Sequence, residues 1–149
     1  MSIDNSARSD GAGVEKLSLV VFSGSFEKVH YALVMASAAL ATGRAVTLFF
    51  TMEASRAVLA PSGWRHLRPD VQGATATSLD FGYSERGVAT FEELLSACAD
   101  LGAKFMVCEM GLRALGLEHE KRRAELTIEV GGVVTFLNDA RKDGEMLFI

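Results

Sequence analysis

Short apolar runs alternate with segments of helical period along most of this chain. The first run spans Leu17 to Phe22, and a second spans Ala45 to Phe50. A third covers Lys104 to Cys108, and weaker runs follow at Leu126 to Val130 and Glu145 to Ile149. Nearly continuous apolar runs of this length are typical of strands that are covered on both faces, as in a parallel sheet. The pattern therefore predicts five strands.

Helical segments separate these predicted strands. Apolar residues recur at close to helical period after Ser25, and Gly43 provides a natural stop. Thr90 is followed three residues later by Glu93, the capping-box pattern with which many helices begin. Shorter helices are predicted at 51–59, 110–115 and 133–141. Each predicted strand is thus separated from the next by helix.

This alternation predicts a single-domain α/β fold of the flavodoxin-like, doubly wound type. Its five-stranded, mainly parallel sheet carries helices on both faces. The strand order typical of such folds, 2-1-3-4-5, makes the first and third strands neighbours, with a binding crevice at their carboxyl ends. The length of 149 residues suits one domain. We expect the domain to span 17–149, after a disordered lead-in at 1–16 that is rich in Ser, Asp and Gly.

Two segments do not follow the alternation. Residues 60–89 show no sustained period and contain both prolines, so we expect an irregular arm or lid there. The charged run 118–125 is predicted to be the solvated face of a helix, without a chemical role.

Composition narrows the classes of partner. The net charge of −4 argues against nucleic acid and anionic membranes as general partners. No stretch is long and apolar enough to cross a bilayer, and the first residues lack the pattern of a secretory signal, so we expect a cytoplasmic protein. His30, His66 and His119 are scattered, and no metal or cofactor is predicted.

Cys108 is the residue that most suggests chemistry, because it ends the third predicted strand and precedes a short helix. A thiol is a good nucleophile only as thiolate, which a helix N-terminus or a nearby cation favours. From position alone a reactive and an inert Cys108 are equally expected, since free cysteine is often simply buried. Cys98 lies on the apolar stripe of a helix, where packing is the better interpretation.

Six residues are predicted to surround the thiol in the shared crevice. The loop after the first strand offers backbone and hydroxyl donors, Lys28 and Arg113 offer positive charge, and the helix that starts near Met110 offers its N-terminus. The predicted binding residues are Ser23, Gly24, Ser25, Lys28, Met110 and Arg113.

Three blocks of the sequence resemble a known family. SGSFEKVHYALVMASAALATGRAVTLFFT, FEELLSACADLGAKFMVCEMGLRALGL and IEVGGVVTFL resemble, in that order, the DsrE/DsrF-like family of small sulfur-relay proteins. The resemblance implies a flavodoxin-like fold, homo-oligomers such as trimers or hexamers, and one cysteine that carries sulfane sulfur as a persulfide. Cys108 stands at the matching position.

Two functions follow as hypotheses. In the first, the protein is a sulfur carrier or sulfurtransferase: Cys108 takes sulfur from a donor protein and hands it to an acceptor protein, each of which has a reactive thiol. In the second, the chain is a non-enzymatic binding or assembly module whose crevice holds a small ligand and whose cysteine is incidental.

Overall fold

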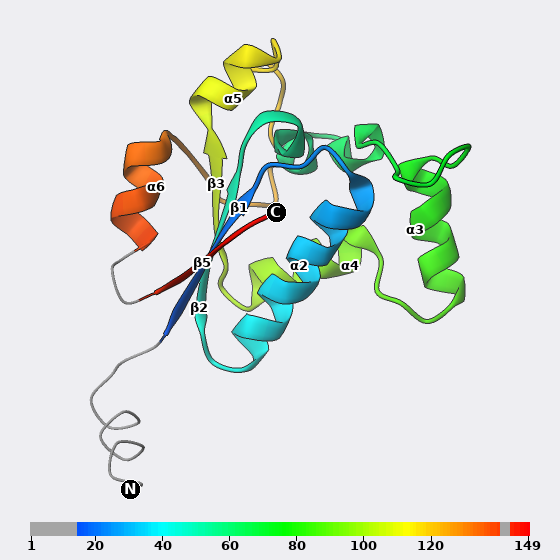
Figure 1. Ribbon diagram of the computed structural model, residues 1–149, viewed down its shortest axis with the longest axis horizontal. Coiled ribbons are helices and arrows are strands. Elements are labelled where there is room, and N and C mark those ends of the chain that lie inside the picture. The colour runs from blue at the N-terminus through cyan, green and yellow to red at the C-terminus, as the bar shows by residue number, and fades with distance from the viewer. Residues whose placement is uncertain (1–14, 141–143) are drawn as a thin grey trace, which may run out of the picture.

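The computed structural model describes residues 15–140 and 144–149 and contains one sheet of five parallel strands (Figure 1). All five predicted strands are present, and their order across the sheet is β4-β3-β2-β1-β5. Most of the predicted lead-in at 1–16 lies outside the described residues, and Lys16 already belongs to the first strand. The strands are β1 (Lys16–Val21), β2 (Ala45–Phe50), β3 (Lys104–Cys108), β4 (Ile128–Gly131) and β5 (Glu145–Phe148).

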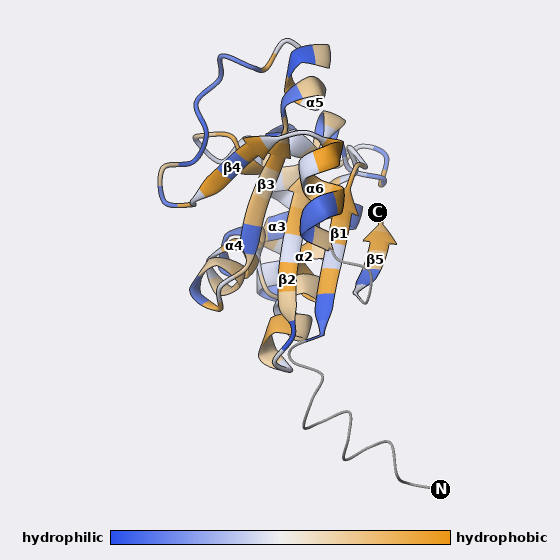
Figure 2. Cartoon of the chain, turned by 90° about the vertical axis from the view of Figure 1, so that its left-hand side faces the viewer, coloured by the Kyte–Doolittle hydropathy of each residue, from blue (hydrophilic) through white to orange (hydrophobic). Residues whose placement is uncertain are grey.

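Helices cover both faces of the sheet, as the fold prediction required. Helices α2 (Phe26–Ala41) and α4 (Phe91–Asp100) pack against one face and each other, whereas α6 (Val133–Ala140) covers the other (Figures 1 and 2). Helix α5 (Glu109–Ala114) lies beyond the carboxyl ends of the strands. No helix in the described part of the chain is both long and apolar enough to span a membrane.

The strand order differs from the predicted 2-1-3-4-5. The chain steps in one direction from β1 to β4 and returns through α6 to place β5 beside β1. Right-handed crossovers put α2 and α4 on one face for the forward steps and α6 on the other for the return. Strand β2 therefore lies between β1 and β3, as the pairs Val21–Phe50 and Phe50–Val107 show. The prediction that β1 and β3 are neighbours is wrong.

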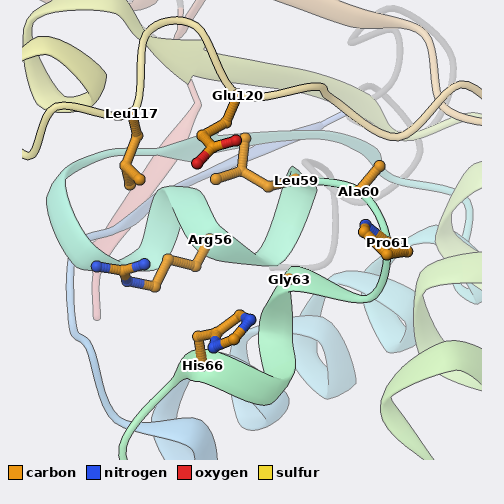
Figure 3. A pocket seen from close by; sticks show the side chains of 8 residues that line it. All are labelled: Arg56, Leu59, Ala60, Pro61, Gly63, His66, Leu117 and Glu120. Atoms are coloured by element: carbon orange, nitrogen blue, oxygen red, sulfur yellow. The ribbon is translucent and has the colours of Figure 1, made fainter.

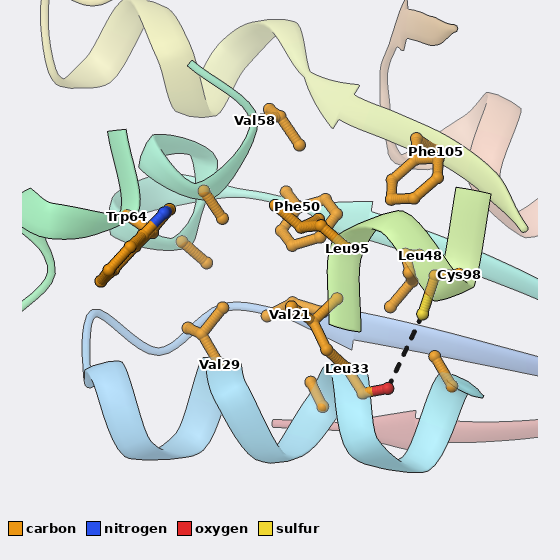
Figure 4. Packing of buried hydrophobic residues seen from close by; sticks show 14 of the residues in the cluster. Val21, Val29, Leu33, Leu48, Phe50, Val58, Trp64, Leu95, Cys98 and Phe105 are labelled. Carbon is orange, nitrogen blue, oxygen red and sulfur yellow. Dashed lines mark hydrogen bonds between the residues drawn. The ribbon is translucent and has the colours of Figure 1, made fainter. Parts of the chain in front are cut away.

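The main core lies between the sheet and the α2–α4 layer (Figure 4). Leu33 of α2 and Phe50 of β2 are fully buried there. Cys98 of α4 is also fully buried, and its Sγ lies 3.7 Å from the carbonyl oxygen of Leu33. Burial raises the pKa of the Cys98 thiol to about 11. Cys98 is therefore a packing residue that stays protonated at neutral pH.

The segment 60–89 is more regular than predicted. It contains the 3-10 helix η2 (Gly63–His66) and the helix α3 (Ala76–Glu85), which begins with a capping box between Thr75 and Ser78. Trp64 is 2% exposed and stacks on Phe91 of α4, with 5.2 Å between ring centroids. The segment predicted to be an irregular arm or lid thus contains two helical elements, of which η2 belongs to the core.

The charged run 118–125 is not helical either. Arg123 donates two hydrogen bonds to Glu92 of α4, with Nη1 to Oε2 at 2.8 Å and Nη2 to Oε1 at 2.5 Å. The Trp64 indole N–H donates to the same carboxylate at 2.5 Å. The hydrogen bonds from Arg123 lower the pKa of Glu92. This run therefore attaches its loop to the domain instead of being solvated throughout.

Helix α6 is attached to its face of the sheet by one aromatic ring and one carboxylate. The Phe136 ring stacks on Phe49 of β2 with 4.7 Å between centroids. Asp139 Oδ2 accepts hydrogen bonds from Lys16 Nζ and Thr47 Oγ1, each at 2.6 Å, and its Oδ1 accepts from Lys104 Nζ at 2.8 Å. Burial alone would raise the pKa of Asp139, but these hydrogen bonds outweigh it and hold the pKa well below its usual range.

Candidate functional site

Cys108 is both the last residue of β3 and the residue that caps the N-terminus of α5. Its Sγ accepts a hydrogen bond from the backbone N–H of Gly111 at 3.4 Å. The thiol thus lies at the carboxyl edge of the sheet, and a backbone amide in the first turn of α5 donates to the sulfur. This amide is placed to hydrogen-bond a negatively charged sulfur.

The start of α5 is pressed against the residues that follow β2. A Cβ on Gly111 would lie 2.6 Å from the backbone nitrogen of Met52 and 2.8 Å from Thr51 Oγ1, so glycine is needed for this approach. Met52 begins the 3-10 helix η1 (Met52–Val58) with φ of 50°, a left-handed conformation that is uncommon for a residue with a side chain. The backbone around the thiol is therefore tightly constrained.

The thiol of Cys108 is covered on the α6 face. Cys108 is 1% exposed and belongs to a small buried cluster with Phe49, Met106 and Phe136. The first two neighbours lie on strands of the sheet, whereas Phe136 lies on α6. An eight-residue helix thus contributes one side chain to the cluster that buries the thiol.

The predicted loop partners of the thiol follow a strand that is not adjacent to β3. Ser23, Gly24 and Ser25 follow β1, from which β3 is separated by β2. The Gly24 carbonyl accepts from Arg68 N at 2.9 Å, and Ser25 Oγ donates to Asp70 Oδ2 at 2.8 Å. Ser25 also caps α2. The loop is thus joined to the segment after η2, and the predicted shared crevice with Cys108 does not follow from the observed strand order.

Known proteins share the family and the fold of this chain. A sequence profile described as the DsrE/DsrF/DrsH-like family matches residues 52–148, a range that includes Cys108. The chain belongs to this family. It is similar to the uncharacterized protein YrkE of Bacillus subtilis (strain 168), with 23% identity over 157 residues, 91% of this chain and 97% of the relative.

The fold of this DsrE/DsrF/DrsH-like protein also resembles a solved structure. The crystal structure of the ychN protein from E. coli aligns with a TM-score of 0.58 at 13% identity. The alignment covers 91% of this chain and 100% of the ychN chain. At this identity the likeness concerns the fold alone.

Lys28, Met110 and Arg113, the other three residues predicted to surround the thiol of this DsrE/DsrF/DrsH-like protein, are solvent-exposed. Met110 is 61% exposed, and Lys28 is exposed on the first turn of α2. Arg113 Nη2 donates to Glu109 Oε1 at 2.7 Å, and both side chains are more than half exposed. The guanidinium of Arg113 is thus paired on the outer surface of α5, away from a buried sulfur.

Sequence patterns did not identify Phe136, Thr51 or Met52 as neighbours of the site. Phe136 is one of several apolar residues on a short helix, and only the observed fold places it against Phe49 in the cluster that contains Cys108. Within the described residues, no group of three or more His, Cys, Asp or Glu side chains is arranged to hold a metal ion.

Proposed function

We propose that this protein is a sulfur carrier in which Cys108 relays sulfane sulfur between two partner proteins. The observation that carries the proposal is the position of Cys108, which ends a strand inside the region matched to the DsrE/DsrF/DrsH-like family. Family membership supports a sulfur-relay role in general, and the Gly111 amide directed at the sulfur supports the choice of this cysteine.

The proposed chemistry consists of two thiol exchanges. The Cys108 thiolate attacks the outer sulfur of a donor persulfide, the donor S–S bond breaks, and the donor leaves as a thiolate. Cys108 then carries the persulfide until an acceptor thiolate attacks its outer sulfur and restores the Cys108 thiolate. Each step exchanges one thiolate for another, so no external oxidant or reductant is needed.

Access to the thiol requires a movement of α6. Because Cys108 is 1% exposed and shares its buried cluster with Phe136, we expect a donor to reach the sulfur when this part of α6 is displaced. Buried thiols are protected from water and from unwanted oxidants. The proposed carrier thus exposes its sulfur only when α6 opens.

Incubation with a persulfide donor tests the relay. Intact mass is expected to show one added sulfur on the wild-type protein and on Cys98→Ser, and none on Cys108→Ser, because Cys98 is sealed in the core. Transfer to a thiol-bearing acceptor should then remove the added mass. Sulfur that remains on Cys108→Ser would exclude this cysteine as the carrier.

The binding-module hypothesis gains one supporting observation, which is the burial of Cys108. If no sulfur is taken up even when α6 is destabilised, a ligand-binding role with an incidental cysteine becomes the better hypothesis. The two hypotheses therefore give opposite results in the same experiment.

The proposal includes a homo-oligomer. Val134 and Leu137 on the outer side of α6 are 74% and 52% exposed, and Phe148 of the edge strand β5 is 70% exposed. Exposed apolar groups of this size favour protein contacts. Light scattering at micromolar concentration is expected to give a mass above that of the 16.0 kDa chain, and a strict monomer would contradict the proposal.

A further inference from the structure

A cavity of about 350 Å³ lies between η1, η2 and the segment that follows α5 (Figure 3). Its lining includes Arg56, Leu59, His66, Leu117 and Glu120, and Cys108 is not among the lining residues. Ligand sites in proteins typically have volumes of roughly 300–1,000 Å³. The cavity is therefore large enough for a small molecule.

The walls of this cavity are fixed by the backbone. Ala60 N donates to the Lys121 carbonyl at 2.8 Å, and Gly63 N donates to the Leu59 carbonyl at 2.9 Å. A Cβ on Gly63 would lie 2.2 Å from the Arg56 carbonyl oxygen, so only glycine permits η1 and η2 to approach this closely. The cavity is thus a feature of the fold and does not depend on side-chain rotamers alone.

Apolar and charged groups occupy different parts of the cavity. Leu59 and Leu117, which are 6% and 8% exposed, provide apolar surface. Arg56 and His66 come from η1 and η2 on one wall, and Glu120 comes from the loop after α5 on the facing wall (Figure 3). A ligand that carries both a carboxylate and an ammonium group would therefore find an opposite charge for each, on facing walls that also carry apolar side chains.

Arg56 has hydrogen-bond donors left for an anion. Its Nε donates to Glu53 Oε2 at 2.8 Å, which holds the guanidinium in place. Within the described residues neither Nη group has a hydrogen-bond partner, so both can donate to a ligand carboxylate in the paired geometry that arginine favours. His66 adds a ring N–H donor in either charge state.

We propose that this cavity binds a small zwitterion whose carboxylate and ammonium groups are separated by a short apolar chain. The carboxylate contacts Arg56 and His66, the methylenes lie over Leu59 and Leu117, and the ammonium contacts Glu120. The site is independent of Cys108, so its failure leaves the sulfur relay untouched.

Calorimetry with three matched probes tests this site. δ-Aminovalerate carries both charges, valerate lacks the ammonium, and n-pentylamine lacks the carboxylate. We expect the full chain to bind δ-aminovalerate at least about tenfold more tightly than either single-charge probe, because each charged contact contributes separately. Equal affinity for the three probes, or no binding of δ-aminovalerate at millimolar concentration, would overturn the proposal.

Substitutions locate the two ends of the ligand. Glu120→Gln is expected to reduce the affinity for δ-aminovalerate to that for valerate and to leave valerate binding unchanged. Arg56→Gln and His66→Gln should weaken both carboxylate probes and leave n-pentylamine unaffected. Glu118→Gln is the control on the same loop, and Cys108→Ser should bind δ-aminovalerate as the wild-type protein does. If Glu120→Gln and Arg56→Gln bind all three probes normally, the site lies elsewhere.

Discussion

Asp139→Asn is expected to lower the free energy of unfolding by about 2–3 kcal/mol at neutral pH. Removing one partner of a buried ion pair typically costs 3–5 kcal/mol, because the other charge stays buried without compensation. Here Lys16 is 16% exposed and would lose its counter-ion. Lys104 is 45% exposed and can be hydrated, which reduces the expected cost.

The pH dependence of this effect follows from the lowered pKa of Asp139. A carboxyl group whose pKa is lower in the folded than in the unfolded state stabilises the fold at every pH above its unfolded pKa, about 3.9. That contribution is lost as the pH falls from about 4 towards the folded pKa. The difference between wild-type protein and Asp139→Asn should therefore be constant near neutral pH and shrink below about pH 4.

Urea denaturation followed by circular dichroism at several pH values measures this difference. Asp100→Asn, at the exposed end of α4, is the matched control and should change stability by no more than about 0.5 kcal/mol. A stability loss in Asp139→Asn that does not vary between pH 7 and pH 3 would show that the charge of Asp139 is not the cause.

The sequence was sufficient to predict the strands and most helices, because their signals are local. β2 and β3 begin and end at the predicted residues, and α4 begins after the predicted capping box at Thr90. The cap of α3 pairs Thr75 with Ser78, not with the Glu or Gln of the usual capping-box pattern, so it did not stand out in the sequence. Only Ala76 and Asp80 of α3 are buried, so its sequence shows no apolar stripe.

Strand order could not be derived from these local patterns. Both 2-1-3-4-5 and the observed order satisfy the rule of right-handed crossovers with the same elements. The difference affects the candidate site, because it places β2 between Cys108 and the Ser23–Ser25 loop. It also brings Phe136 of α6 onto Phe49 of β2, in the buried cluster that contains Cys108, where the sequence predicted an open crevice.

The ion-pair partners of Asp139 and Arg123 could not be predicted from the sequence either. Asp139 is 35 residues from Lys104 and 123 residues from Lys16 along the chain, and the sheet brings all three together. Arg123 lay within a run that resembled a solvated surface, yet it pairs with Glu92. Charge patterns in a sequence indicate ion-pair partners reliably only where the two residues are close in sequence, as on one face of a helix.

Phe136→Ala is expected to raise the rate at which iodoacetamide modifies Cys108 in the native protein by about tenfold or more. The rate of labelling of a buried thiol follows the equilibrium for opening its cover. The equilibrium constant for opening rises tenfold for each 1.4 kcal/mol by which the free energy of opening falls. Deleting a buried phenylalanine side chain typically removes 3–5 kcal/mol of stabilisation. Phe136→Leu, which leaves a smaller cavity, should give an intermediate rate and protects the test against a variant that does not fold.

The labelling rate of Cys98, and the urea dependence of the rates at both cysteines, distinguish opening of α6 from global unfolding. The contacts of Phe136 are lost both when α6 opens and when the whole protein unfolds. Labelling of each cysteine is therefore measured by peptide mass at increasing urea concentrations below the unfolding transition. Cys108 should be labelled faster than Cys98, with a weak dependence on urea, because displacement of α6 exposes little surface. Asn138→Ala, at an exposed position of the same helix, should leave the Cys108 rate nearly unchanged. Equal rates at both cysteines with the same steep urea dependence would mean that the thiol is exposed only by global unfolding, and the relay would then lack access to its sulfur.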